Sequence, residues 1–243
     1  MTVLDELVSA ARRRELPPPR IPDRPAASLL DALRRAVGAP IRVIAEVKRA
    51  SPSRGVIRAD ADAVATALAY EAAGAAAVSV LTEPTRFGGS FDDLVAVAGA
   101  VAIPVLCKDF VTTEAHILAA AGCGAAGVLL IARAIPRGLD HLVEAALAAG
   151  IEPLVEVHDD VDLARALATA ARLIGVNHRD LATLHIDRSR GEGLLNRVPP
   201  DRVRVAESGY EDPATMRAAP ADAVLVGTAL MRNPALLAEA TRP

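Results

Sequence analysis

Charged side chains alternate with apolar ones at the end of one short segment of this sequence, and their types could support acid–base chemistry. The segment IAEVKRASPSRG, residues 44–55, begins like a β-strand and carries Glu46 and Lys48 two positions apart. Alternate side chains of a strand point to opposite faces, so Ile44, Glu46 and Lys48 should share one face. A carboxylate and an ammonium on a face that should be buried are costly unless they pair with each other or with a ligand.

The same alternation recurs in four further segments. The side chains that share a face in them are Leu106, Lys108 and Phe110; Leu154, Glu156 and His158; Gly175, Asn177 and Arg179; and Val205, Glu207 and Gly209. If these faces meet, lysines, glutamates and an asparagine converge, where they would offset one another's burial and shift one another's pKa values. A buried ion-pair network without catalytic function explains any single residue equally well. Five segments with polar groups at one level favour a functional site. If stability were their only purpose, apolar side chains would often serve equally well.

Eight segments rich in Val, Ile and Leu alternate with Ala-rich helical segments after residue 40. They are RVIAEV, AAVSVL, IPVLCK, GVLLIA, EPLVEV, LIGVN, RVRVAE and AVLVG. Segments that are apolar on both faces are typical of a parallel sheet covered by crossover helices. Eight such units predict an α/β protein with a (βα)8 TIM barrel, whose active site lies on the loops after the carboxyl ends of the strands. An open doubly wound sheet is the alternative.

The first 40 residues differ from the rest. An amphipathic pattern predicts a helix over Val3–Arg13, the proline-rich LPPPRIPDRP follows, and a second helix is expected over Ala27–Val37. We interpret residues 1–40 as a helical extension packed on the barrel and residues 41–243 as the catalytic barrel, with a solvated tail as the alternative. Within the barrel, Asp60 is expected to open the first helix.

Composition excludes several classes of protein. Lys and Arg number 27 against 30 Asp and Glu, and only 2% of residues are aromatic, so neither a nucleic-acid footprint nor a base-stacking surface is expected. No apolar run approaches the ~20 residues that span a bilayer, and no signal peptide is recognisable, so we expect a cytoplasmic protein without a membrane partner. The sequence does not determine the oligomeric state, and a monomer is the simplest expectation.

Cysteine and histidine spacings indicate neither a disulfide framework nor a metal site. Cys107 and Cys123 lack a CxxC partner, and Cys107 should face the helices because its parity is opposite to that of Lys108. The five histidines show no zinc spacing and are interpreted as surface or packing residues; they are His116, His141, His158, His178 and His185.

Glycine-containing turns follow the last two predicted strands. ESGY, residues 207–210, and VGTAL, residues 226–230, occupy the positions where barrels commonly bind phosphate through backbone N–H groups. GCGAAG, residues 122–127, also matches a dinucleotide pattern, but it closes a helix and precedes a strand. We therefore interpret GCGAAG as a glycine helix end.

Seven segments in order resemble one enzyme family. EVKRASPSRG, LTEPTRFGGS, PVLCKDF, LVEVH, GVNHRDL, AESG and LVGTALM are similar to the indole-3-glycerol phosphate synthases of tryptophan biosynthesis, over about residues 41–232. The resemblance implies conversion of 1-(2-carboxyphenylamino)-1-deoxyribulose 5-phosphate into indole-3-glycerol phosphate, carbon dioxide and water. It implies no metal and no organic cofactor. The chain departs from the usual pattern at Cys107, His178 and Tyr210, and in its shorter amino-terminal extension.

The resemblance also implies a role for each polar group. Lys108 resembles the general acid for ring closure, and Glu46 and Lys48 resemble an acid–base pair near the dehydration step. Glu156 resembles a carboxylate that assists the developing charge. These groups suit a reaction that needs acids and bases in one cavity. Either lysine could serve either step.

The remaining residues would bind and orient the substrate. Asn177 and Glu207 would orient it, with Ser208 beside the phosphate turn. The apolar slot for the anthranilate ring would comprise Phe87, Phe110, Leu129, Ile131 and Leu181. The contacts to carboxylate or phosphate would come from Ser51, Arg179, Gly209, Gly227 and Thr228.

Two other functions fit parts of the pattern. A Schiff-base lyase or aldolase acting on a sugar phosphate would use Lys108 or Lys48 as a nucleophile, although the surrounding glutamates favour protonated lysines. A phosphate-binding paralogue would bind without turnover, although the complete set of acids and bases argues against it. Borohydride trapping would distinguish the first of these from the synthase.

Overall fold

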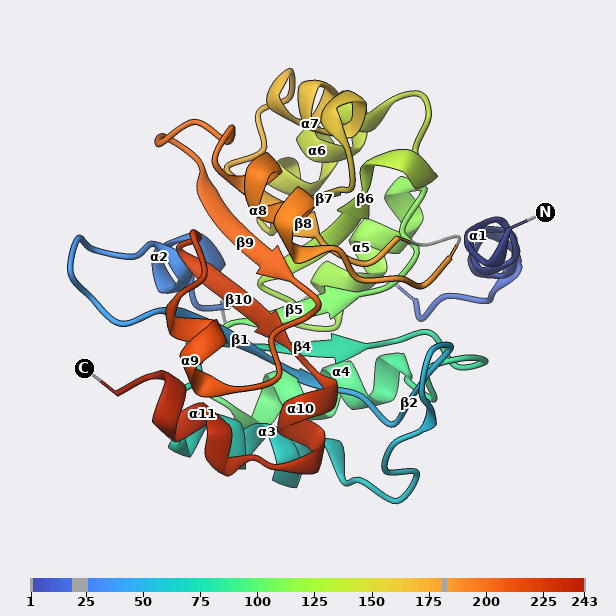
Figure 1. Cartoon of the computed structure of the whole chain (residues 1–243). Coiled ribbons are helices and arrows are strands. Elements are labelled where there is room, and N and C mark those ends of the chain that lie inside the picture. The colour runs from blue at the N-terminus through green and yellow to red at the C-terminus, as the bar shows by residue number, and fades with distance from the viewer. Residues whose placement is uncertain (1, 19–25, 181–182, 243) are drawn as a thin grey trace.

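Eight parallel strands form a closed barrel in the computed structural model, which describes residues 2–18, 26–180 and 183–242. The order around the barrel is β1-β10-β9-β8-β7-β6-β5-β4, and β4 pairs with β1 to close it (Figure 1). The strands are β1 (Arg42–Val47), β4 (Ala77–Leu81), β5 (Val105–Lys108), β6 (Gly127–Ile131), β7 (Glu152–Val157), β8 (Leu173–Asn177), β9 (Val203–Glu207) and β10 (Ala223–Val226). All eight predicted segments are confirmed as strands, and the open sheet is wrong.

Helices on the chain between successive strands cover the outside of the barrel. They are α3 (Ala63–Ala72), α4 (Phe91–Ala100), α5 (Glu114–Gly122), α6 (Leu139–Ala148), α7 (Asp160–Leu167), α8 (Arg188–Leu195) and α9 (Pro213–Arg217), followed by α10 (Thr228–Arg232) and α11 (Ala235–Ala240). The prediction that Asp60 opens the first of these was wrong. Asp62 is the N-cap of α3, because its carboxylate accepts the N–H of Ala65 at 2.9 Å. Among the described residues, no helix is long and apolar enough to span a bilayer.

Two apolar layers account for the alternation along the strands. One layer fills the barrel interior and includes Leu106, while the other lies between strands and helices and includes Cys107. Cys107 therefore faces the helices, as its parity predicted. The GCGAAG segment ends α5 and leads into β6, with Gly124 at φ +84°, which confirms a glycine turn.

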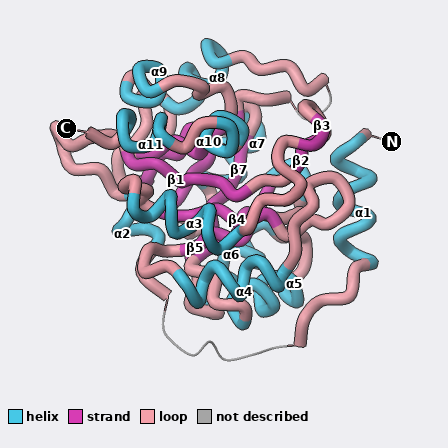
Figure 2. The backbone as a smooth tube through the Cα atoms, turned by 90° about the horizontal axis from the view of Figure 1, so that it is seen from below, coloured by secondary structure: helices cyan, strands magenta, loops and turns pink. Residues whose placement is uncertain are grey.

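The described residues before the barrel form two helices, which lie near opposite ends of the barrel (Figure 2). Helix α1 spans Val3–Arg13 as predicted, with a capping box between Thr2 and Asp5. Helix α2 spans only Leu29–Leu33, shorter than the predicted Ala27–Val37. The chain becomes extended at Arg34, and the Arg35 guanidinium holds the following turn through the carbonyls of Ala39 and Ala221.

Helix α2 closes the amino-terminal end of the barrel with apolar side chains. Leu29, Leu30 and Leu33 are buried in the same layer as Leu106 and Leu173. A Cβ atom at Gly127 on β6 would overlap the Leu29 side chain. Glycine at position 127 thus allows α2 to approach the strands closely.

Helix α1 lies near the opposite, carboxyl end and is attached through polar contacts. The Arg14 guanidinium pairs with the carboxylate of Asp109 and donates to the carbonyl of Thr82 at 3.1 Å. The carbonyl of Ala11 lies 3.1 Å from Nε2 of the His116 ring. Asp109 follows Lys108 directly, so α1 is attached beside a predicted site residue.

The burial of Leu29 predicts a stability effect that leaves the chemistry intact. Leu29→Ala should lower the free energy of unfolding by about 2–5 kcal/mol, because it leaves a cavity in a closed apolar layer. Leu118→Ala is the matched control, since Leu118 is 50% exposed and should change stability far less. Urea unfolding of both variants measures the difference, and equal losses would contradict the role given to α2.

Candidate active site

A cavity opens at the carboxyl ends of the strands, with about 1260 Å³ of space that includes part of the open mouth. Its walls contain every described residue of the predicted site. These are Glu46, Lys48, Ser51, Phe87, Lys108, Phe110, Leu129, Ile131, Glu156, Asn177, Arg179, Glu207, Ser208, Gly209, Gly227 and Thr228. Leu181, the remaining predicted residue, lies outside the described residues. The fold therefore brings together residues from all eight strands or the loops after them.

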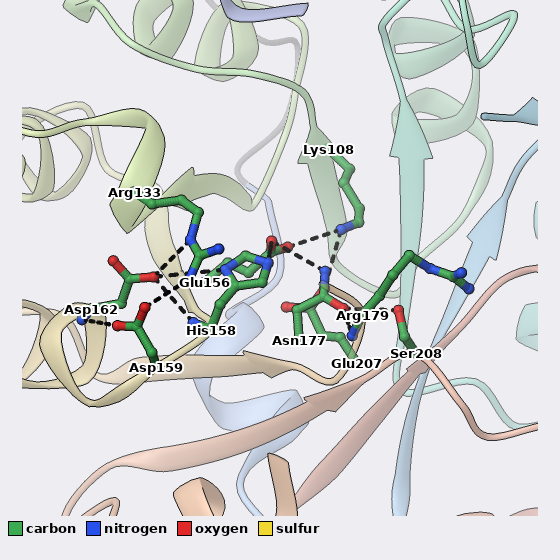
Figure 3. A network of polar contacts seen from close by, with 10 residues as sticks. All are labelled: Lys108, Arg133, Glu156, His158, Asp159, Asp162, Asn177, Arg179, Glu207 and Ser208. Carbon is green, nitrogen blue, oxygen red and sulfur yellow. Dashed lines mark hydrogen bonds and ion pairs between the residues drawn. The ribbon is translucent and has the colours of Figure 1, made fainter. Parts of the chain in front are cut away.

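Lys108 lies at the end of β5 between two buried carboxylates (Figure 3). Its Nζ is 3.1 Å from Oε2 of Glu207 on β9 and 3.5 Å from Oε2 of Glu156 on β7. Both carboxylate side chains are only 2% exposed, whereas that of Lys108 is 15% exposed. One ammonium is thus shared by two acids that lie largely away from water.

This sharing gives the three groups different proton affinities. Burial tends to lower the pKa of Lys108, but the combined attraction of Glu207, Glu156 and Glu46 outweighs burial and raises it. Burial and the neighbouring Glu156 charge raise the pKa of Glu207 to about 8, against the opposing pull of Lys108. Burial opposes ionisation of Glu156 too, yet Lys108, His158 and Asn177 together lower its pKa. The pKa values of Lys108 and Glu207 are thus raised and that of Glu156 is lowered, so the three neighbouring groups differ in how readily they release a proton.

Glu46 and Lys48 form a second pair on the neighbouring part of the wall. Lys48 donates to Oε1 of Glu46 at 2.7 Å, and the Glu46 side chain is 1% exposed. Oε2 of Glu46 and Oε1 of Glu207 are buried without a hydrogen-bond partner among the described residues. These oxygens remain available for a ligand in the cavity.

Two glycines make room for these carboxylates. A Cβ atom at Gly227, after β10, would overlap Oε1 of Glu46, and one at Gly175 on β8 would overlap Oε1 of Glu207. Gly227 was predicted as a phosphate contact, and the structure adds a steric function at the same position. The alternation of Gly175 with Asn177 gave no indication of such a function.

Asn177 connects the acids to the turn at Ser208 and Gly209, where phosphate binding was predicted. Its Nδ2 donates to Oε1 of Glu156 at 3.2 Å, while its Oδ1 accepts from Ser208 Oγ at 2.9 Å and from the backbone N–H of Arg179 at 3.0 Å. Ser208 has φ +68°, a left-handed conformation that side chains rarely adopt, and Gly209 follows at φ +86°. Strain at this turn is consistent with a functional constraint.

An aromatic pair forms one wall of the cavity. The rings of Phe87 and Phe110 lie 6.2 Å apart at 42°. Glu83, buried in the loop before Phe87, accepts backbone N–H groups from Thr85, Arg86 and Phe87 at 2.7–3.1 Å. The loop conformation that presents Phe87 thus depends on a carboxylate that sequence reasoning did not select.

Sequence reasoning also missed the part of the wall that comes from the amino-terminal helix. Val3, Leu4 and Leu7 of α1 line the cavity. Their helical spacing predicted an amphipathic helix but not which surface its apolar face would meet. Across the mouth, Arg54 pairs with Glu211 at 3.2 Å, and the loop that carries Arg54 includes the short strands β2 (Ala50–Ser51) and β3 (Gly55–Val56).

The interpretation of His158 as a surface or packing residue does not include its position beside a predicted catalytic carboxylate. Its side chain is 3% exposed, with Nε2 3.2 Å from Oε1 of Glu156. The alternation of Glu156 and His158 along one segment was the available signal. No group of three or more His, Cys, Asp or Glu within the described chain is arranged to hold a metal ion.

A closed (βα)8 barrel, with a cavity at the carboxyl ends of its strands lined by lysines and carboxylates, is the architecture of TIM-barrel enzymes. The sequence model for indole-3-glycerol phosphate synthase matches residues 8–242, and the chain belongs to that family.

Several curated relatives carry the same description. "Indole-3-glycerol phosphate synthase 1" of Streptomyces coelicolor is 44% identical over 95% of this chain and 90% of the relative. "Indole-3-glycerol phosphate synthase" of Micrococcus luteus is 45% identical over 96% of this chain and 93% of the relative. The protein of that name from a Parafrankia species is 50% identical over 86% of this chain and 78% of the relative.

The raised pKa of Glu207 predicts a pH-dependent loss of stability. The folded protein holds the Glu207 proton more tightly than the unfolded chain does, so the free energy of unfolding should fall as pH rises from about 4.5 to about 8. Glu207→Gln mimics the neutral acid and should lack this contribution. Urea unfolding measures the free energy of unfolding of both proteins. The value for the wild type minus that for Glu207→Gln should therefore decrease by a few kcal/mol over that pH range. Parallel curves for the two proteins would contradict a raised pKa.

Proposed function

We propose that this chain closes the indole ring of 1-(2-carboxyphenylamino)-1-deoxyribulose 5-phosphate, releasing carbon dioxide and water, with Lys108 as the acid for ring closure. The observation that carries the assignment of the acid is the Lys108 ammonium, held charged between Glu156 and Glu207 at the base of a cavity with an aromatic wall. A charged ammonium among carboxylates can donate a proton and regain one locally.

Ring closure needs a proton at the ketone oxygen of the substrate. The aryl carbon that bears the carboxylate attacks the ketone carbon, and Lys108 donates a proton to the oxygen as the carbon–oxygen π bond breaks. Loss of carbon dioxide returns the bonding electrons to the ring and restores its aromaticity. The ionised Glu156 would stabilise positive charge that develops on the ring and its nitrogen.

Dehydration needs an acid for the leaving hydroxyl and a base for a proton. We assign both tasks to Lys48 and Glu46, which lie 2.7 Å apart. Lys48 would protonate the hydroxyl as it leaves as water, and Glu46 would accept the proton removed from the adjacent carbon. The unpartnered Oε2 of Glu46 supports the assignment of the base. Glu207, with its raised pKa, would donate a hydrogen bond that orients the substrate.

We place the two ends of the substrate on different walls. The anthranilate ring would lie along Phe87 and Phe110, beside Leu129 and Ile131 of β6. Ser51, whose buried Oγ has no partner among the described residues, and Arg179 would meet an anionic group. The phosphate would meet the turns at Gly209 and at Gly227 with Thr228, which both line the cavity.

The Schiff-base alternative is less consistent with the charges around the lysines. An amine must lose its proton to attack a carbonyl, and the carboxylates around Lys108 raise its pKa. The test of function is to supply the carboxyphenylamino-deoxyribulose phosphate and record the appearance of indole fluorescence. No fluorescence from folded protein would exclude the synthase. Borohydride inactivation with a keto-sugar phosphate would support the lyase.

We also propose how the chain works as a whole. Residues 1–40 would act as an extension of the catalytic barrel, residues 41–243, with α1 supplying part of the cavity wall. The enzyme would act in the cytoplasm, as a monomer. Sedimentation of the active enzyme tests the monomer, and a stable dimer would overturn it.

Removing the proton of Lys108 should reduce turnover with little loss of binding. Lys108→Met keeps the apolar stem, and the loss of a general acid typically costs about 10²- to 10⁴-fold. We expect kcat to fall at least that far, with affinity within about tenfold, because the ring slot and the phosphate turns are unchanged. Stopped-flow fluorescence and calorimetric binding measure the two quantities. Ring closure at a near wild-type rate would move the acid to Lys48.

The phosphate assignment is best tested at Thr228. A bulky residue at Gly227 would weaken substrate and free-phosphate binding, but it would also displace Glu46, because a side chain there overlaps that carboxylate. Thr228→Val keeps the shape and removes one hydroxyl, so it should weaken substrate and inorganic phosphate by about tenfold or more. Thr215→Val, on the outer helix α9, is the control. Unchanged affinity for both ligands would show that the Thr228 hydroxyl does not contact the phosphate.

A further inference from the structure

His158 lies behind Glu156, on the side away from Lys108 (Figure 3). Oε2 of Glu156 lies 3.5 Å from Lys108, whereas Oε1 has Asn177 Nδ2 and His158 Nε2, each at 3.2 Å. Among the described residues, His158 does not line the main cavity, but it lines a second, polar cavity together with Asn177. The imidazole is therefore placed to hold Glu156 rather than to touch the substrate.

The other side of the imidazole faces a second carboxylate. Oδ2 of Asp162 accepts the backbone N–H of His158 at 3.3 Å and lies 3.8 Å from His158 Nδ1. Arg133 fixes this carboxylate, with Nε 3.1 Å from Asp162 Oδ2 and Nη2 2.9 Å from Asp159 Oδ2. The backbone N–H of Asp162 donates to Asp159 at 2.9 Å. The ring thus lies between two carboxylates, at 3.2 Å from Glu156 and 3.8 Å from Asp162, although neither ring nitrogen makes a hydrogen bond of normal geometry among the described residues. The outer carboxylate is anchored to an arginine.

The charges that face His158 come from several elements. Those in its immediate network are Glu156 of β7, Asp159 at the start of α7, Asp162 and Arg165 of α7, and Arg133 of the short helix η1 (Ala132–Ala134). The second cavity adds groups from the chain after β8, namely His178, Arg179, Asp180, His185, Asp187 and Arg190. A neutral imidazole carries one N–H group, and this group faces Glu156 when it is on Nε2.

We propose that His158 is a positioning residue, whose Nε2–H holds Oε1 of Glu156 so that Oε2 faces Lys108 and the substrate. Asp162 and Arg133 fix the imidazole in turn. The inference rests on the proposed function of Glu156. Glu156 must stay ionised and correctly directed although it is buried, and small displacements of a catalytic group can cost about 10²-fold in rate. The lowered pKa of Glu156, to which His158 contributes, is consistent with this contact.

Matched substitutions separate positioning from packing. The amide nitrogen of Gln can occupy the place of His Nε2, whereas the shorter Asn reaches only the place of Nδ1. His158→Leu fills the site without a donor. We expect His158→Leu and His158→Asn to lower kcat at least tenfold with KM within about threefold, and His158→Gln to keep kcat within about threefold of the wild type. His141→Gln, on the exposed surface of α6, should change neither constant.

Thermal unfolding of each variant serves as the packing measurement. If His158→Gln is as slow as His158→Leu, or if kcat falls only in step with stability, the positioning role is overturned. Near wild-type kcat in His158→Leu would overturn it as well.

A readout without turnover separates this inference from the proposed function. Carbon-13 NMR of the Glu156 carboxylate follows its pKa in the protein alone. The pKa of Glu156 should rise in His158→Leu and return towards the wild-type value in His158→Gln. An unchanged Glu156 pKa in His158→Leu would contradict the contact. If the two variants shift the Glu156 pKa as expected but the wild type shows no turnover, only the proposed function is contradicted.

Discussion

One ammonium shared by two buried carboxylates is the interaction on which the site depends. Lys108 is held by Glu156 and Glu207 at 3.5 and 3.1 Å, and none of the three groups has free access to water. Two buried carboxylates beside one cation repel each other, and their pKa values shift apart: that of Glu207 rises and that of Glu156 falls. The barrel makes this arrangement possible because it brings the ends of β5, β7 and β9 to one level although they lie far apart in sequence.

The elements of the barrel could be predicted from sequence because each follows from a local pattern. The eight strands are short, apolar on both faces and bounded by glycine or charge, and the inward parity of Lys108 and Glu156 follows from a period of two. The start of α3 was misplaced because Asp60 and Asp62 are equally good caps, and tertiary packing decides between them. The length of α2 was overestimated because helix propensity does not indicate where the chain must turn towards β1.

Other parts of the site depend on contacts across long sequence separations. Glycine at 175 carries no chemical group, so its relation to Glu207, 32 positions later in the numbering, is visible only in three dimensions. The contribution of α1 to the cavity depends on Arg14 meeting Asp109, and neither residue shows this locally. His158 shared the right parity with Glu156, yet a second-layer contact cannot be distinguished from a packing contact by alternation alone.

The absent side chains at Gly175 and Gly227 have a consequence for how this site tolerates change. Each glycine leaves the volume that one carboxylate occupies, Glu207 in the first case and Glu46 in the second. A methyl group at either position would displace an acid while leaving every reactive group in the sequence. In a map of tolerated substitutions, these two positions would therefore be as restricted as the acids themselves, and each glycine should be inherited together with its acid.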